Sequence, residues 1–323
     1  MMNNKIKSLI VCNLCNSSQT TQISLKDRDK KYLRTVICKE CGLIWSDPRP
    51  EEKEIQEFYS KKYRKEYKGI IKPKKKHVYR DSKEAIKRYE FFKDIISKND
   101  KLLDIGAGNG VFVACMKEIG INAKGIDPDQ NHAKYARQEL KAPVETGFAS
   151  QIKTKQFYNI ITLHHVLEHL IDPFIELKNI HSMLAKDGYL VLEVPNAQDL
   201  KQNPKNRYHK AHLYTFNLAT LSAIGIKAGF NVVRQKTARL NGNISMIFQK
   251  NDTSDLSLLF LSKNYSNIVN LLNKYNIVRH FLSYIPYFKF FSNIYNSIAE
   301  QISIMRYEDD RDIVRSVSYM ASK

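Results

Sequence analysis

The chain lacks a long uninterrupted apolar run. Charged residues break every such run well before the roughly 18 residues that a transmembrane helix needs. Residues 1–11 also lack the apolar central stretch of a signal peptide, because only Leu9 to Val11 form an apolar run there. We therefore expect no transmembrane segment and a cytoplasmic protein.

Glycine, proline and cysteine are all scarce, with 12 glycines, 9 prolines and 5 cysteines in 323 residues. This composition excludes a collagen-like repeat and a small domain held together by disulfides. Hydrophobic residues make up 43% of the chain and charged residues 26%, which excludes a disordered polypeptide and is typical of a folded protein.

Acidic residues are too few to balance the basic ones. The chain has 52 Lys and Arg against 33 Asp and Glu, which gives a formal net charge of +19. A field of this sign attracts anions, so we expect an anionic substrate or partner. Much of the excess lies between Lys61 and Arg80, where tyrosines alternate with the basic residues.

Four of the cysteines form two pairs with two residues between the members of each pair: Cys12, Cys15, Cys38 and Cys41. This spacing lets both thiolates of one tight turn face a single tetrahedral ion, and Gly42 suits the positive φ that such a turn often needs. Four thiolates leave no position for water, so the predicted zinc would be structural. Cysteines without metal, or a redox pair, are less favoured alternatives. Cys115 is expected to pack as a small apolar residue.

From Asp81 onward, helical patterns alternate with short apolar strands, which indicates a parallel α/β sheet. A glycine-rich turn, Gly106 to Gly110, joins the strand at 101–105 to a helix and can bring backbone N–H groups close to a ligand. Val111 stands where a dinucleotide fingerprint has its third glycine, which disfavours a dinucleotide. Asp127, at the end of the next strand, can accept both ribose hydroxyls of a nucleoside; alternatively it caps the following helix.

These features together resemble the class I S-adenosylmethionine-dependent methyltransferases. The resemblance covers residues 82–250 and is carried by four motifs in the same order, at 102–110, 125–128, 160–170 and 184–196. It implies an α/β, Rossmann-like fold with a seven-stranded sheet. The last two strands of that sheet, expected here at 230–236 and 244–250, would form an antiparallel hairpin.

The resemblance also implies where S-adenosylmethionine would bind. Asp104 and the glycine turn would hold the methionine moiety, and Asp127 the ribose. Many relatives carry an acid for the adenine amino group where this chain has Gly147-Phe148-Ala149, so we expect backbone groups and the Phe148 ring to hold the adenine. The predicted cofactor-binding residues are Asp104, Gly106, Gly108, Asn109, Gly110, Asp127, Phe148, Ala149 and His164.

Two groups of histidines follow the fourth and fifth strands. A hydroxyl or carbon acceptor benefits from a general base with a pKa near neutrality, whereas an amine needs little beyond proximity. His165, His209 and His212 are therefore the candidate catalytic residues, and a polar lining of the pocket is the alternative. His165, Glu168 and His169 also match an inverted zinc-protease motif, which we reject because it directly follows a strand instead of lying within a helix.

Residues 12–50 extend the resemblance. The stretch from Cys38 to Pro50 is similar to the paired-cysteine module of a bacterial methyltransferase group often associated with sugars of surface glycans and secondary metabolites. This implies a small sugar-containing acceptor linked to a nucleotide or phosphate, with O-, N- and C-methylation all open. The alternatives are an RNA methyltransferase and a zinc-containing binding protein that does not catalyse.

We expect four segments: a zinc-binding module (1–58), a basic linker (59–81), a methyltransferase core (82–250) and a helical extension (251–323). The linker could bind single-stranded RNA through its lysines and tyrosines, although a solvated linker is favoured. The aromatic stretch 277–298 contains Arg279 and Lys289 and is expected to kink at Pro286. A packed cap or dimer contact is favoured for it over an interfacial membrane helix. The sequence leaves the oligomeric state open.

Overall fold

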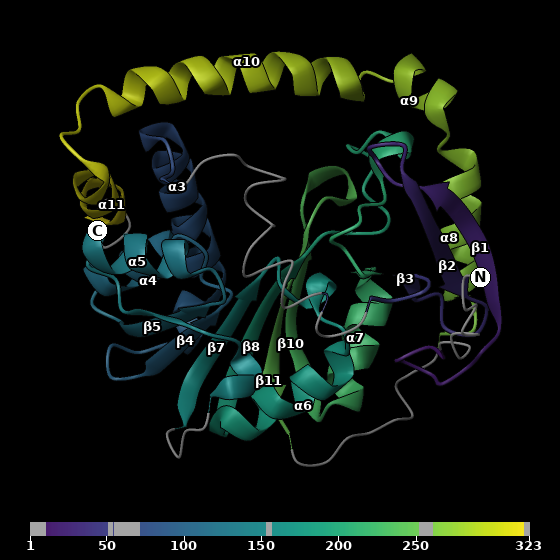
Figure 1. Cartoon of the computed structure of the whole chain (residues 1–323), viewed down its shortest axis with the longest axis horizontal. Coiled ribbons are helices and arrows are strands. Elements are labelled where there is room, and N and C mark those ends of the chain that lie inside the picture. The colour runs from purple at the N-terminus through teal and green to yellow at the C-terminus, as the bar shows by residue number, and fades with distance from the viewer. Residues whose placement is uncertain (1–10, 51–53, 55–71, 153–156, 252–260, 320–323) are drawn as a thin grey trace, which may run out of the picture.

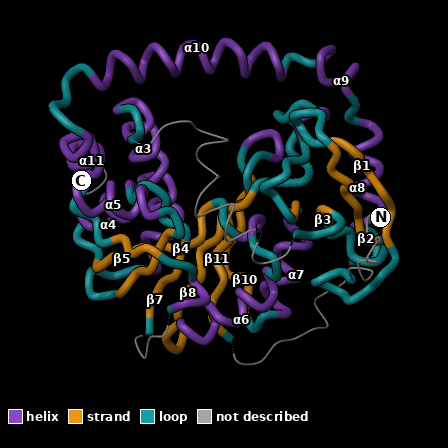
Figure 2. The backbone as a smooth tube through the Cα atoms, in the orientation of Figure 1, coloured by secondary structure: helices purple, strands orange, loops and turns teal. Residues whose placement is uncertain are grey.

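The computed structural model describes residues 11–50, 54, 72–152, 157–251 and 261–319, and these form two sheets with flanking helices (Figures 1 and 2). The larger sheet has seven strands in the order β10-β11-β8-β7-β4-β5-β6, and the smaller has four in the order β1-β2-β3-β9. The central sheet positions the site described below.

The strands of the central sheet are β4 (Lys101–Ile105), β5 (Asn122–Asp127), β6 (Val144–Thr146), β7 (Tyr158–His164), β8 (Leu184–Val194), β10 (Phe230–Thr237) and β11 (Ile244–Lys250). β4 pairs in parallel with β5 and β7, and β8 in parallel with β7. β11 runs antiparallel to both β8 and β10. The expected Rossmann-like sheet with an antiparallel terminal hairpin is therefore confirmed.

Helices cover both faces of this sheet: α3 (Lys75–Phe92), α4 (Val111–Glu118), α5 (Gln130–Gln138), α6 (Pro173–Met183) and α7 (Leu218–Lys227). Alternate side chains of a strand point to opposite faces, so Leu102 packs in one buried cluster and Leu103 in the other. The Leu102 cluster contains residues of α3 and α4, including Cys115, and the Leu103 cluster contains residues of α6 and α7.

Helix α3 begins earlier than the expected core boundary at residue 82. Val78, Tyr79, Ser82 and Ala85 are buried on one face of this helix, which packs beside α4 and the C-terminal helix α11 (Asp310–Tyr319). Residues 75–81 of the expected linker are thus helical.

The connections between the described strands and helices include five short 3₁₀ turns: η2 (Lys93–Ile95), η3 (Ala149–Gln151), η4 (Leu167–His169), η5 (Pro204–Asn206) and η6 (Arg239–Asn241).

The N-terminal segment shares a sheet with the core. Strands β1 (Thr20–Lys26), β2 (Tyr32–Cys38) and β3 (Ile44–Ser46) form an antiparallel meander, and β9 (Tyr214–Thr215) from the core adds beside β3. The ammonium group of Lys227 on α7 donates to the carbonyl oxygens of Asn13 (3.1 Å) and Leu14 (2.9 Å). These contacts attach the paired-cysteine module directly to the sheet-flanking helix.

The C-terminal extension contains α8 (Asn264–Lys274), α9 (Ile277–Leu282), α10 (Ile285–Ile304) and α11. Helix α8 packs on the small sheet through Ile268, and α11 packs on the core through Ile313 and Val317. The packed cap was expected for residues 277–298, and there it was wrong, because Phe281, Phe291 and Tyr295 of α9 and α10 are at least half exposed. Pro286 lies in the first turn of α10, where its missing N–H is tolerated, and the stretch 277–298 is interrupted just before it, between α9 and α10.

Helix α10 runs along the outer edge of the molecule between α9 and α11 (Figure 1). Among the described helices, none combines the length and apolar character that crossing a membrane requires.

Candidate functional site

The glycine turn between β4 and α4 presents open backbone at its centre. Gly108 has φ +56°, and a Cβ built on it would meet no heavy atom within 4 Å. A Cβ on Gly110 (φ +75°) would instead lie 2.4 Å from the Cβ of Ala136 on α5. Gly110 therefore permits close helix packing, whereas Gly108 leaves its backbone accessible to a ligand.

Asp127 links the end of β5 to this turn. Its carboxylate accepts from the backbone N–H groups of Gly108 (2.7 Å) and Asp129 (2.9 Å), and the residue is 7% exposed. The helix that follows is capped by Asp129, whose carboxylate accepts from the N–H groups at the start of α5. The alternative role of Asp127 as the cap of this helix is thus excluded.

Asp104 and His164 lie together at the ends of adjacent strands. The Thr162 hydroxyl donates to Asp104 (2.6 Å), and Nδ1 of His164 lies 3.4 Å from the same carboxylate oxygen. Burial lowers the pKa of His164, and the positive charge of Arg88 lowers it further. Nε2 of His164 is buried and has no hydrogen-bond partner among the described residues, which makes it a candidate contact for a bound molecule.

The remaining expected cofactor residues surround the same turn. Gly147 donates its N–H to the backbone oxygen of Asp127 (3.0 Å), which brings the half-buried Phe148 and Ala149 next to this strand end. The Asn109 amide donates to Asp81 on α3 (3.1 Å), so this side chain ties the turn to a helix. The structure thus brings the expected cofactor residues to one edge of the sheet.

A hollow of about 350 Å³ adjoins this edge and is lined by both His164 and Glu193. Its walls come from α3 and from the β10–β11 connection. The cationic side chains that line it are Lys87, Arg88, Lys236 and Arg239. Glu84 and Glu193 also line the hollow and pair with Lys87 and Arg88, so its net positive charge comes from Lys236 and Arg239. The hollow shares His164 with the candidate cofactor site.

Residues 76–235 match the sequence profile of a family described as a methyltransferase domain. These residues form a methyltransferase domain. The chain is 24% identical over 163 residues to the C-methyltransferase NovU of Streptomyces niveus, which is 47% of this chain and 38% of that protein. It is 28% identical over 104 residues to a ubiquinone biosynthesis O-methyltransferase of Pelagibacter ubique, 31% of this chain and 43% of that one. The chain thus spans less than half the length of these curated relatives.

Solved structures also include similar chains. The magnesium protoporphyrin IX methyltransferase of Synechocystis with SAH bound is 13% identical, with a TM-score of 0.47, and the match covers 62% of this chain and all of that one. The methyltransferase domain expected from the sequence is confirmed by the family match, and its fold by the strand order of the central sheet.

A line of alternating charges begins at the wall of the hollow, with Arg88 and Glu193, and continues to His165 and Glu168. Nε2 of His165 is 2.9 Å from Glu193, whose carboxylate also accepts from Arg88 (2.7 Å). Nδ1 of His165 is 3.5 Å from the buried carboxylate of Glu168. His165 has φ +58°, a left-handed conformation that is uncommon and costs energy for a residue other than glycine.

These contacts set the charge of His165. Burial lowers its pKa, but the contacts with Glu168 and Glu193 outweigh burial and raise the pKa to about 9. Burial likewise raises the pKa of Glu193, but His165 and Arg88 hold it well below its usual value. At neutral pH, His165 is therefore protonated and is not available as a base in the resting site.

The other two candidate catalytic histidines lie on the loop before β9. Their rings contact each other (centroids 5.0 Å apart), and the His212 ring also contacts His169 (4.8 Å). Burial and the charge of Arg28 lower the pKa of His209 to about 4, and burial and His169 lower that of His212 to about 3. Both are thus neutral, and neither is among the residues that line the described hollow.

The rejected zinc-protease motif can also be examined. Glu168, His169 and His212 each offer a ligand atom within 4.8 Å of the others, and His165 is not a member of this group. Glu168 and His169 lie in the 3₁₀ turn η4 that follows β7. The motif therefore does not lie within a longer helix.

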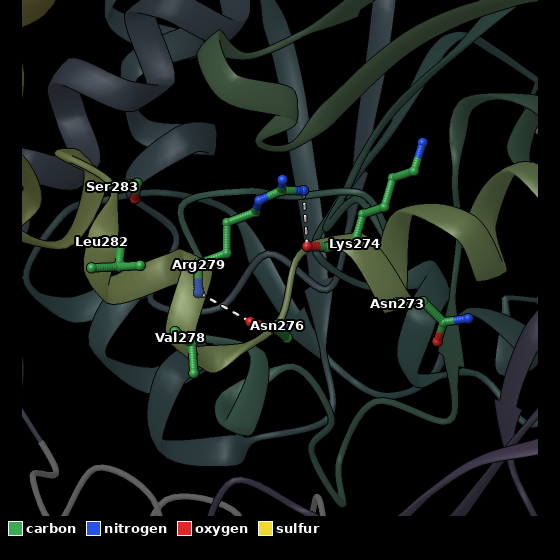
Figure 3. Close-up of a pocket in the computed structure, with 7 residues that line it drawn as sticks. All are labelled: Asn273, Lys274, Asn276, Val278, Arg279, Leu282 and Ser283. Carbon is green, nitrogen blue, oxygen red and sulfur yellow. Dashed lines mark hydrogen bonds between the residues drawn. The ribbon is translucent and has the colours of Figure 1, made fainter.

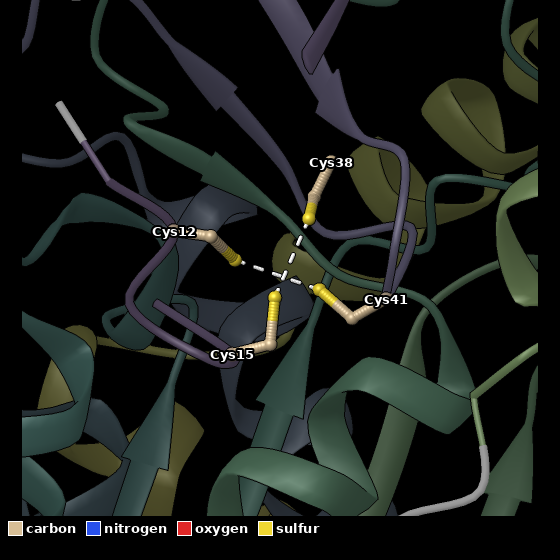
Figure 4. A group of neighbouring side chains, drawn as sticks. All are labelled: Cys12, Cys15, Cys38 and Cys41. Carbon is tan, nitrogen blue, oxygen red and sulfur yellow. Dashed lines mark hydrogen bonds between the residues drawn. The ribbon is translucent and has the colours of Figure 1, made fainter. Parts of the chain in front are cut away.

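The four paired cysteines converge at one point (Figure 4). The Sγ atoms of Cys12 and Cys41 are 3.5 Å apart, those of Cys15 and Cys38 are 3.4 Å apart, and all four lie within 4.8 Å of one another. Thiolates at about 2.3 Å from a tetrahedral zinc ion would lie about 3.8 Å apart, so the cluster is compatible with zinc. Gly42 has the expected positive φ, +75°.

Sequence reasoning missed the basic wall of the hollow and the partners of His165. Arg88 belongs to a helix whose apolar pattern indicated only a core helix, and Glu193 lies in a buried strand. Lys236 on β10 and Arg239 in the β10–β11 connection lie far along the chain from Arg88. The only signal for them in the sequence was the overall basic charge.

We expect Glu193→Gln to lower the pKa of His165 from about 9 toward its ordinary value of 6.5, because one of the two carboxylates that raise it is lost. Titration of histidine Cε1–H signals by NMR, with His165→Gln to assign the signal, measures this change. His181, which is distant in the fold and hydrogen-bonded to the backbone of Asn251, serves as an internal control. An unchanged His165 titration would contradict the assignment.

Proposed function

We propose that this chain is an S-adenosylmethionine-dependent methyltransferase that acts on a small, anionic, sugar-containing acceptor. The observation that carries the proposal is the hollow of net positive charge that is lined by His164, whose ring contacts Asp104 of the candidate cofactor site. The match to a methyltransferase domain supports the reaction, and the charge of the hollow supports the acceptor class.

The residues present fit the cofactor. The open face of Gly108 and the buried carboxylates of Asp104 and Asp127 would hold the methionine and ribose moieties, and Phe148 would pack on the adenine. S-adenosylmethionine supplies an electrophilic methyl group for an in-line displacement. The unpartnered Nε2 of His164 would face the space between this turn and the hollow.

The acceptor would be held by charge. Arg88 and Lys236 stand on two different walls of a hollow whose volume, about 350 Å³, suits a small molecule such as a sugar phosphate. Both ring N–H groups of the protonated His165 are directed at Glu168 and Glu193, so we propose that His165 positions Glu193 at the wall of the hollow. The curated relatives include a C-methyltransferase and an O-methyltransferase. We therefore propose that the methyl group is transferred to either a carbon or an oxygen atom of the acceptor.

A hydroxyl or carbon acceptor must also lose a proton. With Nδ1 of His164 donating to Asp104, its Nε2 keeps a lone pair, so we propose His164 as the base in place of His165. His209 and His212 are neutral but do not line the hollow, and His212 lies with His169 close to Glu168, so we propose that these rings pack around this carboxylate.

We further propose that the four cysteines hold a structural zinc ion. The backbone oxygen of Cys41 accepts from Asn264 on α8 (2.8 Å), and Asn264 is bonded to Asn217 at the start of α7 (2.7 Å). Ordering the cysteine turns would therefore also order the junction of the module with the core.

The RNA interpretation depends largely on residues 61–71, which lie outside the described residues. Methylation of RNA is therefore one of the outcomes of the experiment with methyl-labelled S-adenosylmethionine described below. The cytoplasmic location and the domain boundaries stay predictions.

Asp127→Asn is expected to weaken binding of S-adenosylmethionine at least roughly tenfold, because a charged acceptor for the ribose hydroxyls is lost. Isothermal titration calorimetry measures the affinity. Asp129→Asn is the matched control, since asparagine can still cap α5 and this residue has no proposed ligand role. Equal losses in the two variants would contradict the role given to Asp127.

The purified chain is expected to contain about one zinc ion, and Cys38→Ser to lose it and unfold at a markedly lower temperature. Metal content by inductively coupled plasma mass spectrometry and thermal melts measure both effects. Cys115→Ala should keep its zinc, because Cys115 is buried in the α3–α4 cluster away from the other four cysteines. A wild-type chain without metal would refute the zinc site.

The acceptor class is tested with methyl-labelled S-adenosylmethionine and a host extract divided into small-molecule, RNA and protein fractions. We expect label in the small-molecule fraction, reduced by Lys236→Ser, which removes a cation from the hollow. Label in RNA would overturn the sugar acceptor while keeping the reaction. No transfer, together with no binding of the cofactor, would leave a non-catalytic zinc protein.

A further inference from the structure

Helix α10 exposes its apolar face. Residues spaced three or four apart fall on one side of a helix, and an apolar stripe with this spacing is 45% to 73% exposed here: Tyr287, Phe291, Ile294, Tyr295, Ile298 and Ile302. A helix of a globular protein normally buries such a stripe against the core. In α10 the apolar stripe is instead exposed.

The polar side of α10 faces the body of the protein. Glu300 forms an ion pair with Arg80 on α3 and its side chain is only 13% exposed. At the other end, Lys289 and Asn293 line a hollow with Arg28 of the β1–β2 turn. One end of the helix is thus tied to α3, and the Lys289 side of its other end faces the β1–β2 turn. The helix runs along the outer edge of the molecule (Figure 1), and its apolar stripe is exposed.

The charged side chains of α8, α9 and α10 up to residue 299 have one sign, and Glu300 on α10 is paired with Arg80. Residues 261–299 contain no Asp or Glu, and their cationic side chains are Lys263, Lys274, Arg279 and Lys289. An open hollow of about 570 Å³ at the α8–α9 junction is lined by Lys274 and Arg279 together with the exposed Val278 and Leu282 (Figure 3). Cations beside exposed apolar side chains match an anionic headgroup above acyl chains.

We propose that α9 and α10 lie flat on an anionic membrane surface, with the apolar stripe inserted and the basic side chains at the headgroups. A second copy is a poorer occupant, because a twofold contact through α9 and α10 would bury the basic side chains Lys274 and Arg279 beside the apolar side chains, with no acid between residues 261 and 299 to neutralise them. Three tyrosines in the stripe region, Tyr284, Tyr287 and Tyr295, suit the interface between water and hydrocarbon.

This orientation would place the acceptor hollow near the membrane. The Arg239 guanidinium lies 5.9 Å from the ring centroid of Phe288 on α10, and Arg239 also lines the acceptor hollow. Arg80, which holds the other end of α10, lies on α3 with Arg88. A lipid-linked anionic acceptor would fit this arrangement; that extension rests on the proposed function, whereas the membrane contact does not.

Flotation of the full chain with vesicles tests the membrane contact. We expect the wild type to float with phosphatidylcholine vesicles that contain phosphatidylglycerol, much less with phosphatidylcholine alone, and less at high salt. The double variant Phe291→Glu and Ile298→Glu should lower the bound fraction roughly tenfold or more, because two inserted apolar side chains are lost. The matched control, Asn293→Glu with Asn296→Glu, adds the same charge to the opposite face and should keep more of the binding.

Circular dichroism melts check that each variant is folded, and Phe291→Ser with Ile298→Ser replaces the charged pair if it is not. Light scattering after gel filtration without lipid gives the oligomeric state. A wild type that does not float, or equal losses in both double variants, would overturn the proposal. A wild-type dimer that becomes monomeric only in the apolar-face variant, without flotation, would assign the stripe to a second copy.

Discussion

The parallel pairing of β4 with β5 and β7 is the constraint on which the rest of the structure depends. Its register places Asp104 opposite Thr162 on one side and Gly125 on the other, so the Thr162 hydroxyl reaches the Asp104 carboxylate. The carboxyl ends of these strands then bring the glycine turn, Asp127 and His164 to one edge. A shift of one residue would turn these side chains to the opposite face of the sheet.

The second determinant is the charge line from Arg88 through Glu193 and His165 to Glu168. Each buried charge has an opposite neighbour, which offsets the cost of removing it from water. This arrangement fixes His165 as a cation and leaves His164, which contacts only Asp104 among these acids, neutral. Two adjacent histidines thus differ in charge because their surroundings differ.

The paired-cysteine module and the C-terminal helices α8 and α11 pack directly on the methyltransferase domain. Strand β9 extends the small sheet, and Asn264 connects the cysteine turn to the start of α7, so the paired-cysteine module, the core and α8 meet in one region. At the other end, α11 packs on α3 and α4, and Tyr135 donates to Asp310 (2.7 Å). Because α8 and α11 are both anchored, α10 spans the distance between them.

The sequence by itself determined the features that depend on short spacing: the cysteine pairs, the glycine turn, Asp127 and the strands of the terminal hairpin. In these, a few neighbouring residues set the backbone geometry and the side-chain direction. The tertiary structure alone decided that Arg88, Lys236 and Arg239 share a hollow, since they come from segments far apart along the chain. It also decided which face of α10 is exposed, because periodicity shows that a helix has an apolar face but not where that face points.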